Sequence, residues 1–500
     1  MLNSYFIATH KFLKQLKILF FSLFLFVLNA YSQDNIPDST WYTPDTKSSN
    51  FFIINIVKIE GNKITHPNII RRELDFKEGS MLPVAKMDSL LKWERNKVFN
   101  TNLFVTVDVI LEETQNPLYK NLVIKVKEQW YTIPQLILDP ADRNLNEWIF
   151  QRGAALNRVN IGMKLFQFNC RGRKETLRLT LQTGFTHNYE LSYEIPYLDR
   201  KQTFGIRPYV SYFNNRSIAY KTDNHVLEYI KSPNEAVLRN FFKTGIIFNY
   251  RKKFFLNHQL DLAYNYNRIA DTIAYLNPDY FLKGRTHQNY INVKYTFNFD
   301  KRDVRQYAKR GYQFTSVFEQ SGITLYEDLR QTSFSAYFAR YYKLSNKFYY
   351  AGKLKARTSF PQLQPFILFK GLGYQQDLVR GFELYAIDGQ HFVLNRNSIR
   401  YKAFEKIFDF GQLVPIRQFR TMPVEIYLTA FADWGSAFND KPLRTYPNTV
   451  SDNTLLSNRL LGSVGLGAHL VTFYNSVLRF EYSLNSIGQA QFFFSIGTDI

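Results

Sequence analysis

Apolar and polar residues alternate one by one over long stretches of the chain between residues 130 and 500. In residues 291–300 the apolar positions are Ile291, Val293, Tyr295, Phe297 and Phe299, and the polar positions are Asn292, Lys294, Thr296, Asn298 and Asp300. Because successive side chains of a strand point to opposite faces, the pattern predicts strands with one apolar and one polar face. About sixteen such strands fit into residues 130–500. They predict a transmembrane antiparallel β-barrel with an apolar outer surface and a polar interior.

Residues 51–129 show shorter periods and predict a small α+β domain ahead of the barrel. Alternation at 53–60, 105–111 and 122–126 predicts three strands, and Pro67 opens a short helix that runs to Leu74. Near-helical spacing of apolar residues predicts a second helix within residues 83–100. Its apolar positions are Val84, Met87, Leu91 and Val98. The expected order is β-α-α-β-β, and the fold class of the whole chain is mainly β.

Residues 1–32 match a secretory signal peptide. Three lysines precede an apolar run from Ile18 to Leu28, and Ala30, Tyr31 and Ser32 form a small-x-small cleavage site. The apolar run is far shorter than the roughly 20 residues that a spanning helix needs, so an uncleaved anchor is the weaker interpretation. No cysteine follows the cleavage site, which disfavours a lipoprotein. Residues 33–50 are rich in Asp, Ser, Thr, Pro and Asn and predict a flexible lead-in.

Aromatic residues are unusually frequent, with 46 Phe, 34 Tyr and 5 Trp in 500 residues. The mean hydropathy is nevertheless negative, at −0.29. Both features fit strands that show apolar side chains to lipid and polar ones to a lumen. A secreted soluble β-protein is the alternative. Cys170 is the only cysteine, so no internal disulfide is possible, and we interpret it as an ordinary strand residue.

The formal charge of +21 suits anionic headgroups or a polar lumen. We expect no nucleic acid partner, because an exported chain without a recognition motif gives no reason for one. The sequence lacks a Gly-x-Ser-x-Gly elbow, a His-Glu-x-x-His motif and a phosphate-binding Gly-rich loop ending in Lys. We therefore expect no enzyme activity, no cofactor and no metal site.

One short motif lies in the long polar insert between residues 361 and 390. It consists of Val379, Arg380, Gly381, Phe382 and Glu383. Two other patterns accompany it: a Phe-x-Asp-x-Gly pattern at Phe431, Asp433 and Gly435, and Arg302-Asp303 followed by Arg310-Gly311-Tyr312. Glu194-Ile195-Pro196-Tyr197 adds a strand-end pattern. With the small domain ahead of a barrel, these motifs in this order resemble the BamA/TamA outer-membrane assembly family, here with a single POTRA domain.

The resemblance implies that the motif loop folds back into the lumen and that its arginine bonds to acidic groups on the inner wall. Strand parity places Asp433 on the polar face, so we expect Arg380 to pair with Asp433. An exposed loop arginine is the alternative. Relatives would offer a glutamate where this chain has Ser398, so a second acidic partner is open between Glu383 and Glu481.

Two strand edges are candidate interaction sites. The last strand, with Phe492, Phe494, Ile496 and Ile500 on one face, is expected to pair with the first strand, which begins near Trp130 and contains Pro134. Proline lacks the N–H that a ladder requires, so Pro134 is expected to weaken this seam unless it lies just below the paired region. Relatives commonly end in an aromatic residue rather than Ile500.

In the small domain, the strand with Val105, Val107 and Val109 offers an edge to a passing polypeptide, or the domain is only a spacer.

The favoured function is an outer-membrane assembly, insertion or translocation factor that templates strands at the barrel seam. The alternatives are a dedicated two-partner secretion channel and a passive pore. The implied location is the outer membrane of a Gram-negative bacterium, with the POTRA-like domain, residues 51–129, in the periplasm. Expected partners are outer-membrane lipid and an unfolded outer-membrane or secreted polypeptide. Accessory periplasmic or lipoprotein subunits are further candidates.

Overall fold

A computed structural model describes residues 51–84, 87–142, 145–232, 236–251, 254–305, 307–323, 327–374, 376–411, 420–440, 456–472 and 477–497. The predicted signal peptide, the lead-in and Ile500 lie outside the described residues. Two compact units make up the chain. One holds residues up to 58, 74–94 and 109–124, and the other holds residues 59–73, 95–108 and 125 onward.

The N-terminal domain contains a four-stranded sheet and two helices. Its elements are β1 (Phe51–Glu60), α2 (Pro67–Arg71), β2 (Met81–Pro83), α3 (Met87–Phe99), β3 (Phe104–Glu113) and β4 (Tyr119–Glu128). The strands lie in the order β2-β1-β4-β3, so β2 and β3 form the two edges. The expected β-α-α-β-β order omits β2, which pairs antiparallel with the first residues of β1. A strand of three residues is too short to show alternation.

Helix α3 buries a different stripe from the one predicted. Its buried positions are Leu90, Glu94, Lys97 and Val98, whereas Val84 precedes the helix and is exposed. The prediction placed Leu91 on the inner face, one residue away from the observed Leu90. The stripe was misplaced because two buried positions carry charged side chains, which apolar periodicity does not detect.

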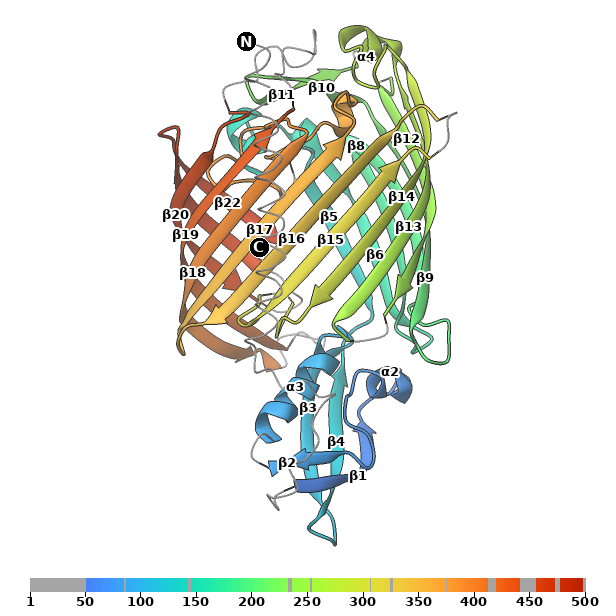
Figure 1. Ribbon diagram of the computed structural model, residues 1–500, viewed down its shortest axis with the longest axis vertical. Coiled ribbons are helices and arrows are strands. Elements are labelled where there is room, and N and C mark those ends of the chain that lie inside the picture. The colour runs from blue at the N-terminus through green and yellow to red at the C-terminus, as the bar shows by residue number, and fades with distance from the viewer. Residues whose placement is uncertain are drawn as a thin grey trace, which may run out of the picture. The chain divides into compact units, whose positions relative to one another are not determined.

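Sixteen antiparallel strands form the barrel (Figure 1), and this number agrees with the prediction. They are β5 (Thr132–Pro140), β6 (Val159–Cys170), β7 (Glu175–Gly184), β8 (Thr186–Glu194), β9 (Phe204–Asn215), β12 (Arg239–Tyr250), β13 (Leu256–Ile269), β14 (His287–Asp300), β15 (Gly311–Ser321), β16 (Gln331–Lys343), β17 (Phe348–Phe360), β18 (His391–Asp409), β19 (Thr421–Phe438), β20 (Leu461–Val471), β21 (Val477–Asn485) and β22 (Ala490–Gly497). Each strand pairs with its sequence neighbour, except that β9 pairs with β12 across an inserted hairpin.

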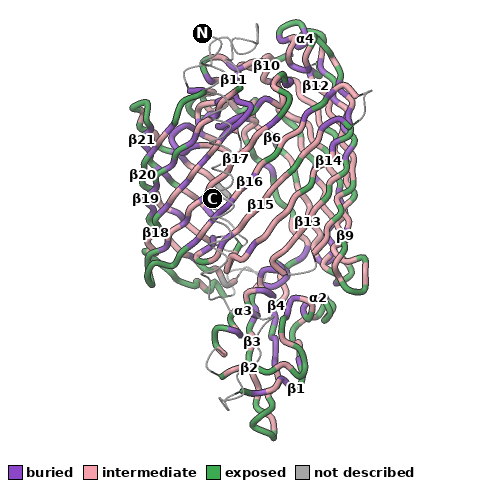
Figure 2. The backbone as a smooth tube through the Cα atoms, in the orientation of Figure 1, coloured by how far each residue is buried: buried purple, intermediate pink, exposed green. Residues whose placement is uncertain are grey.

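The barrel wall separates apolar from polar side chains as the alternation predicts. On β14, Ile291 and Tyr295 are exposed on the outer face, whereas Asn292 between them is buried. On β19, Leu428 and Trp434 are exposed and Asp433 is buried. Buried residues gather on the wall that carries β18 to β21 (Figure 2). Across the described residues, every helix is too short or too polar to pass through a bilayer.

We call the end of the barrel where β5 begins the proximal end and the end where it finishes the distal end. The distal connections carry their own structure: η2 (Glu147–Gln151), η3 (Leu156–Arg158), the hairpin of β10 (Ser217–Asp223) and β11 (Val226–Lys231), α4 (Asp271–Leu276) and η4 (Phe366–Leu368). Residues 221–231, although polar in sequence, belong to this hairpin. Ile218 of β10 and Ile273 of α4 share one buried cluster, so these connections pack together.

Candidate functional site

The motif loop, residues 361–390, joins β17 to β18 and packs against the inner side of the barrel. An isolated bridge between Leu372 and Ile387 closes the loop on itself. An apolar cluster holds it to the wall and consists of Leu372, Val379, Phe382, Ile387, Phe392, Leu394, Ala437, Leu456 and Leu461, with Tyr385 at its margin. The motif is therefore fixed by apolar burial on strands β18 to β20 as well as by polar contacts.

Arg380 is buried and makes a bidentate contact with Asp433. Its Nε donates to Oδ2 of Asp433 at 2.7 Å, and its Nη2 donates to Oδ1 at 2.7 Å. The Asp433 side chain is fully buried. The planar guanidinium matches the two carboxylate oxygens, which makes this one of the stronger kinds of hydrogen-bonded ion pair. The structure thus brings together the two residues that strand parity had paired.

Glu481 is the second acidic contact of Arg380. Nη1 of Arg380 donates to Oε1 of Glu481 at 2.9 Å, and Nη2 donates to Oγ of Ser398 at 3.1 Å. Glu383 instead accepts the backbone N–H of Gly381 at 2.7 Å and so shapes the loop. Of the two candidates that the sequence left open, Glu481 is therefore the one that contacts Arg380.

Aromatic packing completes the enclosure of the arginine. Cζ of Arg380 lies 3.9 Å from the centre of the Phe431 ring, which is close enough for a cation–π contact. Phe431 and Asp433 are inward-facing neighbours on β19, so a single strand supplies both the aromatic face and the carboxylate. In this low-dielectric environment, two carboxylates and one ring offset the desolvation of one guanidinium.

Two glycines permit the close approach of loop and wall. Gly381 has φ of +89°, in the left-handed region that favours glycine, and its carbonyl accepts a hydrogen bond from Nδ2 of Asn485 at 2.7 Å. A Cβ on Gly435 would stand 2.8 Å from Cγ2 of Val379. The glycine at the end of the Phe-x-Asp-x-Gly pattern therefore leaves room for the first residue of the loop motif.

The seam of the barrel is formed by β5 and β22, which stand at the two ends of the strand order. The expected ladder between them is not found among the described residues. The backbone N–H of Phe494 in β22 is directed instead to Oδ1 of Asn146, at 3.4 Å. Pro134 lies inside β5, opposite Leu165 of β6.

The other seam residues follow the alternation of β22. Phe492 is exposed and Phe494 is half-buried, and both rings lie near Phe480 of β21. Ile496 pairs through its backbone with Leu478.

In the N-terminal domain, β3 is an edge strand whose Val107 is buried, with Val105 and Val109 half-buried. These valines serve the domain core, and the backbone carbonyl of Val107 accepts a hydrogen bond of 2.8 Å from Nε of Arg95.

The turn at residues 302–312 is organised by one carboxylate. Oδ1 of Asp303 accepts the backbone N–H groups of Val304, Lys309 and Arg310. Arg302 pairs with Asp300, its Nε lying 2.9 Å from Oδ1. The motif is therefore a structural turn at the proximal end.

A buried acidic group outside the motifs was missed by sequence reasoning. Both oxygens of Glu73 accept hydrogen bonds of 2.9 Å from Arg251, and Arg72 lies 3.2 Å away. Burial alone would raise the pKa of Glu73, but the charges of Arg251, Lys174 and Arg72 outweigh it and lower that pKa to about 2. Residues 59–73 belong to the same compact unit as the barrel, so this cluster is internal to that unit.

Fold and site together define a class: a sixteen-stranded barrel with a small α+β domain before it and an arginine-bearing loop inside it. Residues 52–129 match the family model for POTRA, described as surface antigen variable number repeat. In fold, the chain is similar to BamA from Haemophilus ducreyi lacking POTRA domains 1–3, with a TM-score of 0.51 and 14% identity over 90% of this chain and 85% of that one.

It is similar to the same degree to CdiB from Escherichia coli, with a TM-score of 0.51 and 11% identity over 89% of this chain and 76% of that one. No curated protein matches the chain in sequence. At such identities the likeness concerns the fold. Residues 52–129 are therefore a POTRA domain, and the barrel that follows shares its fold with BamA and CdiB.

Proposed function

We propose that the protein is a Gram-negative outer-membrane factor that inserts or translocates polypeptides by offering strand edges at the β5–β22 seam. The proposal rests on how β5 and β22 are bonded. They are the two outermost strands in the strand order, and the backbone N–H of Phe494 donates to a side-chain oxygen of Asn146 rather than to a strand. Backbone groups without a strand partner are costly in a bilayer, so an added strand lowers the free energy of the edge.

Outer-membrane placement follows from the apolar outer face of the barrel. Exposed apolar side chains occur around its circumference, for example Leu191 on β8, Phe334 on β16 and Leu466 on β20. A surface of this kind is stable against lipid rather than water. With an even number of strands, both ends of the barrel chain lie at the proximal end. The proposal puts that end, and the POTRA domain, in the periplasm.

The mechanism uses no bond chemistry and no cofactor. The incoming polypeptide would first add to the edge of β3 in the POTRA domain and then to the seam of the barrel, in both cases through main-chain hydrogen bonds. Pro134 removes one backbone donor from β5, which limits how firmly the seam can close on itself. The Arg380 loop would hold together the wall of β18 to β21, which directly adjoins the seam strand β22.

Crosslinking across the seam tests the proposal. In a Cys170→Ala background, cysteines at Gln135 and at Gln491 or Ser495 are joined by a reducible bis-thiol linker, and insertion of an unfolded barrel substrate into vesicles is measured. We expect insertion to stop and to return on reduction. The control joins cysteines at Lys164 and Thr180, which are already paired across β6 and β7. Full insertion by the seam-locked protein would refute strand templating.

A photo-crosslinker tests the first step. Placed at the exposed Thr106 of the edge strand β3, it should capture the added substrate, whereas placed at the exposed Lys125 of the central strand β4 it should not. Equal capture at both positions would show that the edge of β3 has no special role.

Dedicated secretion of one partner protein is the second candidate, because the fold likeness extends to CdiB as closely as to BamA. Depletion of the protein followed by a survey of the outer-membrane proteome separates the two. Loss of many barrels indicates general assembly, and loss of one exported protein indicates dedicated secretion. A passive pore would instead give a large steady single-channel current that does not change when Arg380 is replaced.

A further inference from the structure

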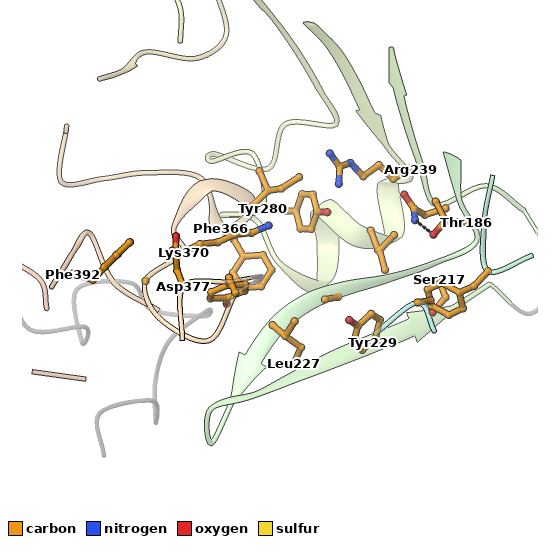
Figure 3. Close-up of a pocket in the computed structure, with 18 of the residues that line it drawn as sticks. Thr186, Ser217, Leu227, Tyr229, Arg239, Tyr280, Phe366, Lys370, Asp377 and Phe392 are labelled. Atoms are coloured by element: carbon orange, nitrogen blue, oxygen red, sulfur yellow. Dashed lines mark hydrogen bonds between the residues drawn. The ribbon is translucent and has the colours of Figure 1, made fainter. Parts of the chain in front are cut away.

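A cavity of about 480 Å³ lies at the distal end of the barrel, away from the Arg380 contacts. Its walls come from the starts of β8 and β12, the end of β9, the β10–β11 hairpin, the segment after α4, and β17 with the loop that follows it (Figure 3). This volume lies within the range of sites that hold small organic ligands.

The cavity collects cations that have no carboxylate partner. Arg239, Arg357 and Lys370 line it, and no ion pair joins any of them to an acidic side chain in the part of the chain that the structure describes. The one carboxylate in the lining, Asp377, is already bound through both oxygens by Lys355 at 2.6 Å. Three cations surround one space, of which Arg239 and Arg357 are half-buried and Lys370 is exposed, and they favour an anion there because an anion would offset their mutual repulsion.

Two of the three cations, Arg239 and Arg357, are held in place before any ligand arrives. Nε of Arg239 donates to Oδ1 of Asn267 at 3.0 Å, and its guanidinium lies over the Phe213 ring. Nη1 of Arg357 donates to the carbonyl of Lys370 at 2.8 Å, which ties the loop to β17. In the view of Figure 3, Arg239 and Lys370 lie on either side of Tyr280. Such preorganisation lowers the entropic cost of binding.

The rest of the lining suits a sugar. Phe185, Tyr229, Tyr280 and Phe366 provide flat aromatic faces, against which the apolar face of a pyranose ring packs. Thr186, Asn215 and Ser217 provide hydroxyl and amide groups, of which Asn215 and Thr186 bond to each other at 2.9 Å. These groups match the hydroxyls of a sugar ring, while the three cations match a phosphate.

We propose that this cavity is a binding site for a phosphorylated sugar, supplied either free or as the headgroup of a glycolipid. The site is separate from the seam and from the Arg380 contacts, so it does not depend on the proposed function. An anion without a ring would leave the aromatic faces uncovered, and a neutral sugar would leave the three cations uncompensated.

Calorimetry on the full chain in detergent micelles tests the site with glucose 6-phosphate, glucose and inorganic phosphate. We expect saturable one-to-one binding of glucose 6-phosphate, at least about tenfold tighter than that of glucose or phosphate. Arg239→Gln and Lys370→Gln should each weaken it about tenfold or more. Lys243→Gln is the matched control. Lys243 lies on the same strand and face as Arg239, is paired with Asp261 at 3.8 Å and does not line the cavity.

Three results would overturn the proposal: no saturable binding, phosphate binding as tightly as glucose 6-phosphate, or an equal loss in the Lys243→Gln protein. Unchanged heat-dependent gel mobility of each variant shows that it is folded. Displacement of glucose 6-phosphate by vesicles that carry a phosphorylated glycolipid, but not by the dephosphorylated lipid, supports the headgroup as its source. Binding without such displacement supports a free sugar phosphate.

Discussion

The side chain of Val379 occupies the space beside Gly435 that any larger residue at position 435 would need. A Cβ there would stand 2.8 Å from Cγ2 of Val379 and 3.0 Å from the carbonyl oxygen of Val393, which is backbone and cannot rotate away. The motif loop and the barrel wall thus fit together where Val379, the first residue of the loop motif, contacts Gly435, the last residue of the Phe-x-Asp-x-Gly pattern.

Gly435→Ala should loosen the loop. Forcing one extra carbon into a close-packed contact costs about 1–3 kcal/mol, and we expect residues 361–390 to become accessible to protease. The measurement is limited proteolysis together with urea unfolding in vesicles. Gly462→Ala on β20 is the control, because the nearest atom to its added Cβ is 4.0 Å away. Equal effects of the two substitutions would contradict a specific contact with Val379.

Arg380→Ala should destabilise the barrel by about 3–5 kcal/mol, because it leaves Asp433 and Glu481 buried without their cation. Arg380→Lys should lie between wild type and Ala, since an ammonium keeps the charge but cannot form the two-pronged contact. Urea unfolding in vesicles measures both. The control, Lys221→Gln, removes the partner of Glu228 in an ion pair whose two side chains are 33% and 38% exposed, and it should change little. A wild-type unfolding midpoint for Arg380→Ala would rule out a structural role for this contact.

Removing both partners should cost less than the two single changes predict. Asp433→Asn alone leaves Arg380 with only Glu481 as a close acid, and Arg380→Gln alone leaves Asp433 with Arg396, whose Nε lies 3.6 Å from Oδ2. The double variant removes both the Arg380 and the Asp433 charge, so neither is left buried without the other. We therefore expect a coupling energy of about 2 kcal/mol. A double-mutant cycle measures this, and strict additivity would argue that the two residues act independently.

The Glu73 cluster predicts acid sensitivity at the proximal end. Its pKa is lowered from 4.5 to about 2 in the folded chain, so its stabilisation is present above pH 4.5 and is lost as pH falls toward 2. The shift corresponds to about 3 kcal/mol. Glu73→Gln should therefore lower stability at pH 7 and narrow its difference from wild type near pH 2. Glu112→Gln, which removes an exposed partner of Lys58, should show neither effect. The measurement is urea unfolding at both pH values.

Most of the fold could be predicted from the local sequence pattern, because alternation within one strand decides which face each side chain takes. That parity sufficed to orient Asp433 inward, and the family resemblance of the loop motif supplied Arg380 as its partner. Strand parity could not show that Glu481 rather than Glu383 contacts Arg380. That contact depends on where the motif loop, 101 residues away from Glu481 in sequence, meets the barrel wall. β2 was too short to recognise, and the β10–β11 hairpin was hidden in a polar stretch. The hydrogen bond between Asn146 and Phe494 could not be predicted, because a single asparagine forms no repeating sequence pattern.

Asn146 belongs to the connection that directly follows β5, and this gives the seam a link to the distal mouth. Two residues of the same connection reach further. Gln151 donates to the carbonyl of Leu384 in the motif loop, and Arg152 donates to the carbonyl of Leu227 in the hairpin. If β5 moved outward, as the proposed function requires, this connection would move with it and would pull on both the motif loop and the hairpin. Opening of the seam toward lipid would then also rearrange the connections at the distal end of the barrel.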